Sequence, residues 1–212
     1  KTAGVQRSVL MDFADFGGFM RLRHLAMALS NLPPHPQHDV SLEQYATEGD
    51  FAARWIAEIV GRGDLNEQTR VVDLGAGNGI LGIGCHLAGA ATTLLIEKDK
   101  HCQHDYEGVE WLIGDVKEWD GNDVDLVIMN PPWGVQISMA DRPFLETAFN
   151  SDAQVIYLLH SAKATHVLPL AKSLNWDGEI ALSGAFKLPA QYEHHRSREG
   201  VTKVTVWRFI RN

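Results

Sequence analysis

The sequence contains little cysteine, no long apolar run and no excess of positive charge. Its two cysteines, Cys85 and Cys102, are too few for a disulfide framework. Neither a signal peptide nor an apolar run of membrane-spanning length is present, so we expect no membrane partner and a reducing, cytoplasmic location. The net charge of -8 argues against a general nucleic-acid binder, because phosphate binding requires positive charge. Any contact with nucleic acid must therefore be local.

A metal centre is also not expected. Cys102 lies close to His101 and His104, but no second cysteine pair accompanies them as a zinc site would require. Solvated loop histidines are the better interpretation of this segment.

The length of 212 residues, 45% of them hydrophobic, suits one well-buried α/β domain and is short for two. Residues 1–40 are interpreted as an N-terminal extension containing one helix over 19–29. Residues 41–212 are predicted to form the main domain, whose first helix should begin near its cap, Asp50.

A glycine-rich turn, residues 75–79, follows a predicted buried strand that ends in Asp73-Leu74 and precedes a predicted helix over 80–88. Glycines let the backbone approach a ligand closely, and the start of a helix supplies free N–H groups. The dinucleotide pattern Gly-x-Gly-x-x-Gly fails, because position 80 is Ile. Gly-x-Gly-x-Gly after a strand ending in Asp indicates S-adenosylmethionine instead, with Asp73, Gly75 and Gly77 at its site. The alternative is tight helix packing by small residues.

Two acidic residues follow the next two predicted strands. Glu97 ends the strand 92–96, where an acid can accept hydrogen bonds from both hydroxyls of a ribose; the alternative is a solvated carboxylate. Asp115 follows the strand 109–113 and is placed to accept from the adenine amine of the cofactor. The link between these strands has only about eleven residues, so this edge of the sheet should be thinly covered.

The apolar run 125–129 is predicted to be a buried parallel strand, and Asn130-Pro131-Pro132-Trp133 follows it directly. Ligands of open α/β sheets bind where such strands end. Two prolines fix φ and remove two N–H donors, so the turn presents acceptors. The Asn130 amide oxygen and the Pro131 carbonyl can both accept from one planar amino group, while Trp133 offers an aromatic face to the ring that carries it. The alternative is a strand stop with a core tryptophan.

Two late strands, 179–186 and 201–210, suggest a terminal hairpin, preceded by a predicted helix over 162–174. The segment between the two strands combines aromatic, histidine and arginine side chains, which suits contacts with RNA backbone and bases. A solvated charged loop is the alternative. The residues expected to bind substrate are Tyr192, His195, Arg196 and Arg198.

Taken together, these residues give the chain a resemblance to the methyltransferase-like protein five family, the archaeal and eukaryotic N6-adenine methyltransferases of small-subunit ribosomal RNA. The resemblance covers roughly residues 40–210, and the combination of motifs is specific although no single motif is. It rests on Leu42-Glu43-Gln44-Tyr45 with Thr47, Asp73-Leu74-Gly75-x-Gly-x-Gly, Asp115-Val116, Val127-Ile128-Met129-Asn130-Pro131-Pro132, Leu159-His160, and Leu188-Pro189-Ala190 with Tyr192.

The resemblance implies an α/β fold of the class I S-adenosylmethionine-dependent type, Rossmann-like, with a mostly parallel seven-stranded sheet and a C-terminal antiparallel hairpin. It implies a heterodimer with a small zinc-ribbon activator protein docked beside the strand 109–113. It also implies that the adenine of the RNA is held by residues 130–133. The residues implied to line the cofactor are Gln44, Thr47, Gly75, Asn78, Ile80, Glu97, Asp115 and Val116.

The chain departs from the family pattern at several positions. Trp133 stands where the family usually has Phe, Glu97 replaces the usual Asp, and the segment after Glu97 is shorter by about a helix. A protein-glutamine N5 methyltransferase also uses an Asn-Pro-Pro-aromatic turn, but its family usually carries an N-terminal helical domain, and only about forty residues precede Gln44 here. A catalytically silent scaffold and a nicotinamide oxidoreductase are the remaining alternatives, the latter disfavoured by the failed fingerprint.

Overall fold

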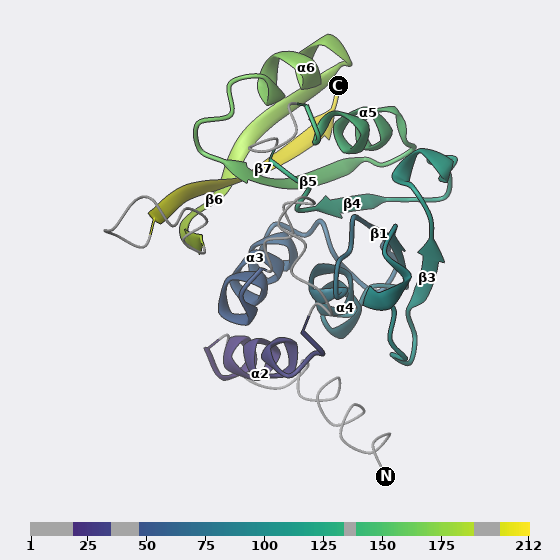
Figure 1. The fold of residues 1–212 in the computed structure, drawn as a ribbon, viewed down its shortest axis with the longest axis vertical. Coiled ribbons are helices and arrows are strands. Elements are labelled where there is room, and N and C mark those ends of the chain that lie inside the picture. Colours follow the sequence, from purple (N-terminus) through teal and green to yellow (C-terminus); the bar gives the residue numbers. More distant parts are fainter. Residues whose placement is uncertain (1–18, 35–46, 134–138, 189–199) are drawn as a thin grey trace.

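The computed structural model describes residues 19–34, 47–133, 139–188 and 200–212, with only the backbone described at 19–21, 187–188 and 200–201. Helices lie on both sides of one central sheet (Figure 1). The helices are α2 (Phe19–Ser30), α3 (Gly49–Gly61), α4 (Ile80–Leu87), α5 (Arg142–Asn150) and α6 (Val167–Ser173). The strands are β1 (Arg70–Leu74), β2 (Thr92–Glu97), β3 (Glu110–Ile113), β4 (Leu126–Met129), β5 (Val155–Ser161), β6 (Trp176–Leu188) and β7 (Gly200–Arg211).

The sheet has seven strands in the order β3-β2-β1-β4-β5-β7-β6. Strands β1 to β5 run parallel, and β7 pairs antiparallel with both β5 and β6. This arrangement confirms the predicted mostly parallel sheet with a C-terminal hairpin. Because β1, β2 and β4 are parallel neighbours, the glycine turn, Glu97 and the Asn-Pro-Pro-Trp turn all leave the same edge of the sheet.

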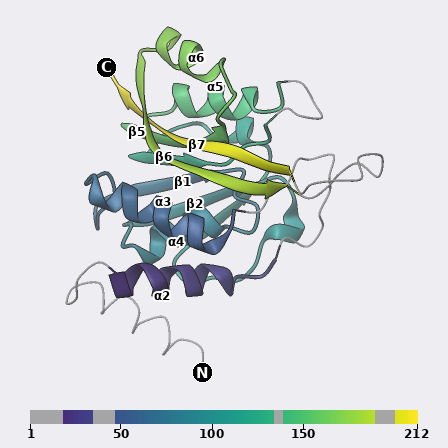
Figure 2. The same ribbon diagram turned by 90° about the vertical axis from the view of Figure 1, so that its left-hand side faces the viewer.

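Two apolar clusters cover the two faces of the sheet. Helices α2, α3 and α4 lie on one face, and α5 and α6 lie on the other (Figures 1 and 2). Strand β4 is buried along its whole length, as expected for a central parallel strand covered on both sides. Helix α2 contributes Leu25, Ala26 and Leu29 to the same cluster as α3 and α4. None of the helices in the described ranges is both long and apolar enough to cross a bilayer.

One predicted helix cap and one predicted helix start are wrong. Helix α3 begins at Gly49 after Glu48, so Asp50 lies in the first turn and is not the cap; there its charge still complements the helix dipole. The sequence pattern predicts a start near residue 162 for α6, which begins at Val167 instead. Pro169 explains the later start, because a proline is tolerated in the first turn of a helix but breaks it further inside.

The link between β2 and β3 contains only a short 3-10 helix, Lys100–Cys102, which confirms the thin cover predicted for this edge. Asp99 caps this turn by accepting a hydrogen bond from the His101 N–H at 2.9 Å. Strand β3 is the edge strand, and its Trp111 and Leu112 are each half-buried against opposite faces of the core.

Candidate active site

The glycine turn after β1 has a backbone that favours glycine at three positions. Gly75, Gly77 and Gly79 have φ of 71°, 56° and 79°, where residues with a Cβ are strained. The turn is tied to the end of β2, because the Gly75 N–H donates to the Ile96 carbonyl at 2.9 Å and the Gly77 N–H donates to Glu97 Oε2 at 2.8 Å. The loop is therefore held in one conformation with its backbone facing the carboxyl edge of the sheet.

Asp73 supports this turn from inside the core. Its side chain is buried and Oδ2 accepts a hydrogen bond from the Gly82 N–H in the first turn of α4 at 2.8 Å. Burial raises the pKa of Asp73 to about 7, although the hydrogen bond from Gly82 opposes this shift. A Cβ at Gly82 would lie 2.0 Å from Leu95 Cδ2 and 3.1 Å from Asp73 Cβ, so α4 approaches the sheet as closely as glycine allows.

Glu97 is oriented by two backbone N–H groups. Oε2 accepts from Gly77, and Oε1 accepts from the Asp99 N–H at 2.9 Å. Each carboxylate oxygen keeps a further lone pair, so a fixed carboxylate can still accept from two hydroxyl groups. The predicted ribose-binding role of Glu97 fits this geometry and stays a prediction.

The end of β3 lies next to that of β2, since the Gly114 N–H donates to the Glu97 carbonyl at 3.0 Å. Asp115 caps the 3-10 helix Val116–Glu118, with Oδ1 accepting from the Lys117 N–H at 3.1 Å. The Lys98 ammonium lies 3.8 Å from Asp115 Oδ2, and Val116 is buried. The structure therefore places two of the predicted cofactor residues beside Glu97.

Asn78 and Ile80 flank the same turn. The Asn78 side chain donates to the Pro33 carbonyl at 3.0 Å, and the Asn78 carbonyl accepts from His104 Nε2 at 3.0 Å. Ile80 is the first residue of α4, and its side chain is buried in the core cluster below the turn. These contacts tie the chain that follows α2 to the glycine turn.

The Asn-Pro-Pro-Trp turn holds its carboxamide at both ends. Asn130 Nδ2 donates to Thr47 Oγ1 at 3.2 Å, and Trp133 Nε1 donates to Asn130 Oδ1 at 3.3 Å. Because an indole N–H can only donate, the amide atom that faces it must be the oxygen. The orientation of the Asn130 amide is therefore determined by its neighbours, and Thr47 is one of them.

Trp133 is part of the core. Its ring is only 7% exposed and stacks with His160 and Phe186, at centroid distances of 6.1 and 6.2 Å and an interplanar angle of 26° in both cases. Stacking with His160 and Phe186 and the hydrogen bond to Asn130 hold the Trp133 ring in place at the end of the turn. Stacking of Trp133 on a substrate base stays a prediction.

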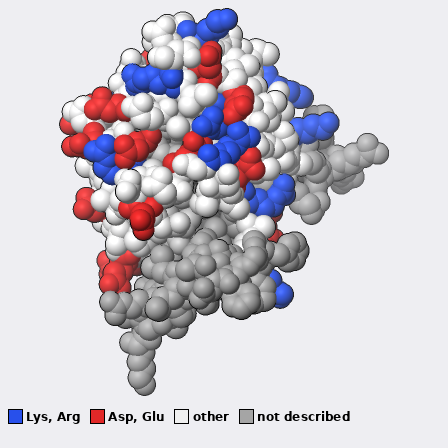
Figure 3. All heavy atoms as spheres, turned by 180° about the vertical axis from the view of Figure 1, so that it is seen from behind, with Lys and Arg blue, Asp and Glu red and all other residues white. Residues whose placement is uncertain are grey.

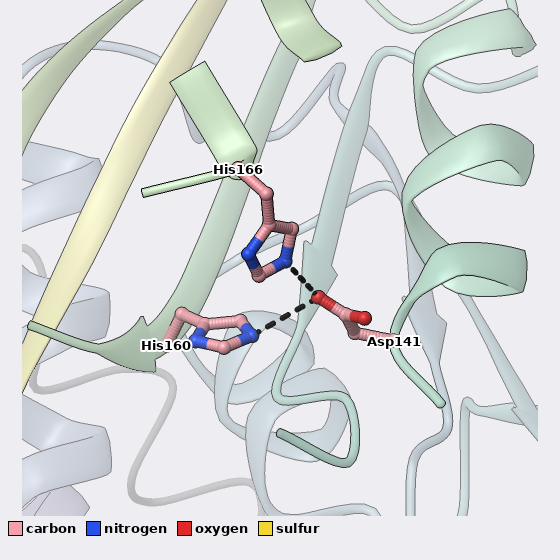
Figure 4. A group of neighbouring side chains, drawn as sticks. All are labelled: Asp141, His160 and His166. Atoms are coloured by element: carbon pink, nitrogen blue, oxygen red, sulfur yellow. Dashed lines mark hydrogen bonds and ion pairs between the residues drawn. The ribbon is translucent and has the colours of Figure 1, made fainter. Parts of the chain in front are cut away.

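Three residues near this turn do not emerge as site residues from the sequence. Asp141 Oδ2 lies 3.1 Å from His160 Nε2 and 2.5 Å from His166 Nε2 (Figure 4). Burial raises the pKa of Asp141, but the hydrogen bonds from His160 and His166 outweigh it and hold the pKa below its ordinary value. The only sequence signal is the Leu159-His160 motif of the family resemblance.

Several predicted site residues lie outside the described ranges. They are Gln44, expected at the cofactor, and Tyr192, His195, Arg196 and Arg198, expected at the substrate.

A glycine turn after β1, an acid after β2 and an Asn-Pro-Pro turn after β4, on this strand order, define a class I S-adenosylmethionine-dependent methyltransferase. No protein-family model matches the chain. It is 28% identical over 206 residues to the rRNA N(6)-adenosine-methyltransferase Mettl5 of Drosophila melanogaster, covering 90% of this chain and 96% of that protein. For the rRNA N(6)-adenosine-methyltransferase METTL5 of Danio rerio the identity is 25% over 210 residues, covering 90% and 99%.

A solved structure extends the comparison. The fold matches that of a candidate RNA methyltransferase from Pyrococcus horikoshii with a TM-score of 0.78 and 32% identity, covering 90% of this chain and 96% of the other. The chain belongs to the methyltransferase-like protein five family, as the sequence motifs predicted.

Proposed function

We propose that the protein transfers a methyl group from S-adenosylmethionine to the N6 amine of an adenosine in the RNA of the small ribosomal subunit, in the cytoplasm. The observation that carries this proposal is the orientation of the Asn130 amide, whose oxygen is an acceptor at the carboxyl end of β4. An acceptor held in this way recognises an amine and discriminates against a carbonyl. The relatives named as rRNA N(6)-adenosine-methyltransferases support the choice of adenosine.

The residues at the carboxyl edge of the sheet fit the cofactor. The turn at Gly75 to Gly79 brings the backbone close to a ligand, Glu97 offers two fixed acceptor oxygens, and Asp115 and Val116 lie beside them. A Cβ at Gly75 would lie 2.7 Å from Phe144 Cε1, so only glycine fits between the turn and α5. S-adenosylmethionine supplies an electrophilic methyl group to the site.

The chain contributes positioning and local electrostatics to the reaction. Asn130 Oδ1 and the Pro131 carbonyl accept the two hydrogens of the amine, which favours a pyramidal nitrogen and directs its lone pair. Proline at 131 and 132 fixes φ, so the two acceptors do not move apart. Thr47 and Trp133 hold the amide before the substrate arrives, so little reorganisation is needed in the transition state. No strong base is required, because the methylated nitrogen is acidic and its proton can leave to water.

The test is to incubate the protein with radiolabelled S-adenosylmethionine and small ribosomal subunits that lack the modification. Digestion to nucleosides followed by chromatography with mass spectrometry should place the label in N6-methyladenosine. Label in N1- or N2-modified nucleosides, or in protein glutamine, would contradict the proposal. Free adenosine and large subunits serve as controls, and both should remain unlabelled.

RNA binding requires a local basic surface in a protein this acidic. On the face shown in Figure 3, Lys and Arg side chains are interspersed with Asp and Glu, so the described residues present no extended basic patch there. The segment between β6 and β7 carries Arg196 and Arg198, which lie outside the described ranges. We propose this segment as the RNA contact.

Changing Arg196 and Arg198 together to Glu should weaken binding of a small-subunit RNA fragment steeply, because two phosphate contacts become repulsive. The slope of log affinity against log salt concentration should fall by about two, since each arginine accounts for about one phosphate. Affinity for S-adenosylmethionine should stay unchanged, which calorimetry can check. An unchanged salt slope would place the RNA contact elsewhere.

Among the described strands, β3 lies at one edge of the sheet, and we propose this edge as the docking site for a small zinc-ribbon activator protein that adds a strand to the sheet. Gly114 donates its N–H to β2, so by alternation the backbone groups of Leu112 also face β2 while those of Trp111 and Ile113 face outward. No described strand pairs with this side of β3, and an edge that exposes backbone groups invites aggregation unless it is covered. Leu112 packs against the core, so a charge there would damage the fold before it affected a partner.

Ile113→Pro tests this edge more specifically than a charged residue at Leu112. It removes an outward N–H and leaves the pairing of β3 with β2 intact. We expect the chain alone to be poorly soluble and co-expression with the zinc-ribbon protein to give a soluble one-to-one complex. Size-exclusion chromatography should show that Ile113→Pro abolishes this complex and that the matched control, Ile113→Val, retains it. A stable, fully active monomer that the zinc-ribbon protein does not affect would rule the dependence out.

A further inference from the structure

Asp141, His160 and His166 form a compact group beside the Asn-Pro-Pro-Trp turn. Asp141 lies just before α5, His160 near the end of β5 and His166 just before α6, and the two imidazoles converge on one carboxylate oxygen of Asp141 (Figure 4). The side chains of Asp141 and His160 are 5% and 2% exposed, whereas that of His166 is 52% exposed. The pair Asp141–His160 is therefore internal, and His166 closes the group on the solvent side.

The hydrogen-bond pattern assigns the protons. Both imidazoles direct Nε2 at Asp141 Oδ2, so each ring carries its hydrogen on Nε2 and donates it. His160 Nδ1 is buried and has no hydrogen-bond partner in the part of the chain that the structure describes. A metal on Nε2 would move the hydrogen of His160 to Nδ1, where no acceptor is available to it among the described residues, although metal-bound histidines almost always have one there. The group is better explained as hydrogen-bonded than as a metal centre.

The buried pair is connected to the catalytic amide. The His160 ring stacks on Trp133 with centroids 6.1 Å apart and planes inclined by 26°. The Trp133 indole in turn donates to Asn130 Oδ1 at 3.3 Å. A fixed His160 ring limits where the indole can lie, and the indole limits where the amide oxygen can point. Asp141 is therefore connected to the Asn130 amide through His160 and Trp133 and does not itself contact the amine proposed to react.

We propose that Asp141 and His160 are positioning residues for methyl transfer. Asp141 orients the His160 imidazole by a buried hydrogen bond, and His160 holds the Trp133 indole against the Asn130 oxygen. His166 shares the same carboxylate oxygen but lies on the solvent side, outside the chain of contacts from Asp141 through His160 to Trp133. The proposal rests on the proposed function for its kinetic consequence, and its structural consequence is independent of that function.

The experiment uses Asp141→Asn, His160→Phe and His166→Gln, with Asp123→Asn as a charge control. Asp123 lies before β4, at the opposite edge of the sheet, with a side chain 94% exposed. Phenylalanine at 160 keeps an aromatic ring and removes the hydrogen bond. The first readout is the indole 15N–1H resonance of Trp133, which can be recognised among the six tryptophan signals by its absence in Trp133→Phe. The second is steady-state methyl transfer to RNA.

We expect Asp141→Asn and His160→Phe to shift the Trp133 resonance and to lower kcat by roughly tenfold to a hundredfold, the scale for a misplacement of about 1 Å. KM for RNA and affinity for S-adenosylmethionine should stay within a few fold. His166→Gln and Asp123→Asn should change neither readout.

Three results would overturn the proposal. The first is a Trp133 resonance that does not respond to Asp141→Asn or His160→Phe. The second is a rise in KM for RNA with kcat unchanged. The third is one metal ion per protein that is retained in the untagged protein and released by His166→Gln. If wild-type protein does not methylate RNA, the proposed function fails, but the resonance shifts still decide whether Asp141 and His160 position Trp133.

Discussion

Replacing Asn130 with alanine is expected to lower methyl transfer at least about a hundredfold, the scale for losing one preorganised transition-state contact. The Asn130 amide is held between Thr47, which accepts from its nitrogen, and Trp133, which donates to its oxygen, so the oxygen is oriented before substrate binds. Alanine removes the acceptor, while the backbone of β4 and its prolines stays in place. The residues predicted to bind the cofactor lie mainly at the ends of β1, β2 and β3, so affinity for S-adenosylmethionine should stay within a few fold.

The measurement is single-turnover methyl transfer together with calorimetric titration of the cofactor. Asn150→Ala is the matched control, because Asn150 ends α5 and its amide donates to the Glu146 carbonyl, away from the site. Asn130→Asp gives a second comparison: it restores an acceptor of the same size but cannot donate to Thr47 as the amide does. Near wild-type turnover of Asn130→Ala would remove Asn130 from the mechanism.

The parts of the fold that follow from local pattern could be predicted from the sequence. Runs of buried apolar residues between turns mark the strands, and the short link after Glu97 marks β3 as a thinly covered edge. These features depend on residues close together in the chain. The predicted start of α6 near residue 162 is wrong because it would place Pro169 in the interior of the helix, where a proline breaks it. The observed start at Val167 places Pro169 in the first turn.

The arrangement of the active site depends on contacts between distant segments. Asp141 is separated from His160 and His166 by 19 and 25 positions, and these residues meet only because β4 and β5 are neighbours in the sheet. Trp133 is predicted to offer its aromatic face to a base, yet its burial comes from Phe186 of β6 and His160 of β5. Similarly, the family resemblance implies Thr47 as a cofactor residue, whereas its described contact orients the Asn130 amide.

Gly77→Val is expected to abolish detectable binding of S-adenosylmethionine. Gly77 has φ of 56°, a conformation that a β-branched residue adopts only at a cost of about 1–3 kcal/mol. Its N–H also holds Glu97 Oε2 at 2.8 Å, so a displaced turn releases the carboxylate predicted to bind the ribose. The substitution therefore affects the cofactor site in two ways, by filling the space near the turn and by freeing Glu97.

Backbone strain alone could weaken binding by destabilising the whole protein, and Gly63→Val separates the two effects. Gly63 has φ of 80°, and a Cβ there would meet nothing within 4 Å, so valine adds comparable strain far from the carboxyl edge of the sheet. Thermal unfolding should show a similar loss of stability in both variants, while calorimetry should show cofactor binding in Gly63→Val only. If Gly77→Val binds S-adenosylmethionine with unchanged affinity, the cofactor does not lie on this turn. If both variants lose binding together, strain explains the loss and the turn need not contact the cofactor.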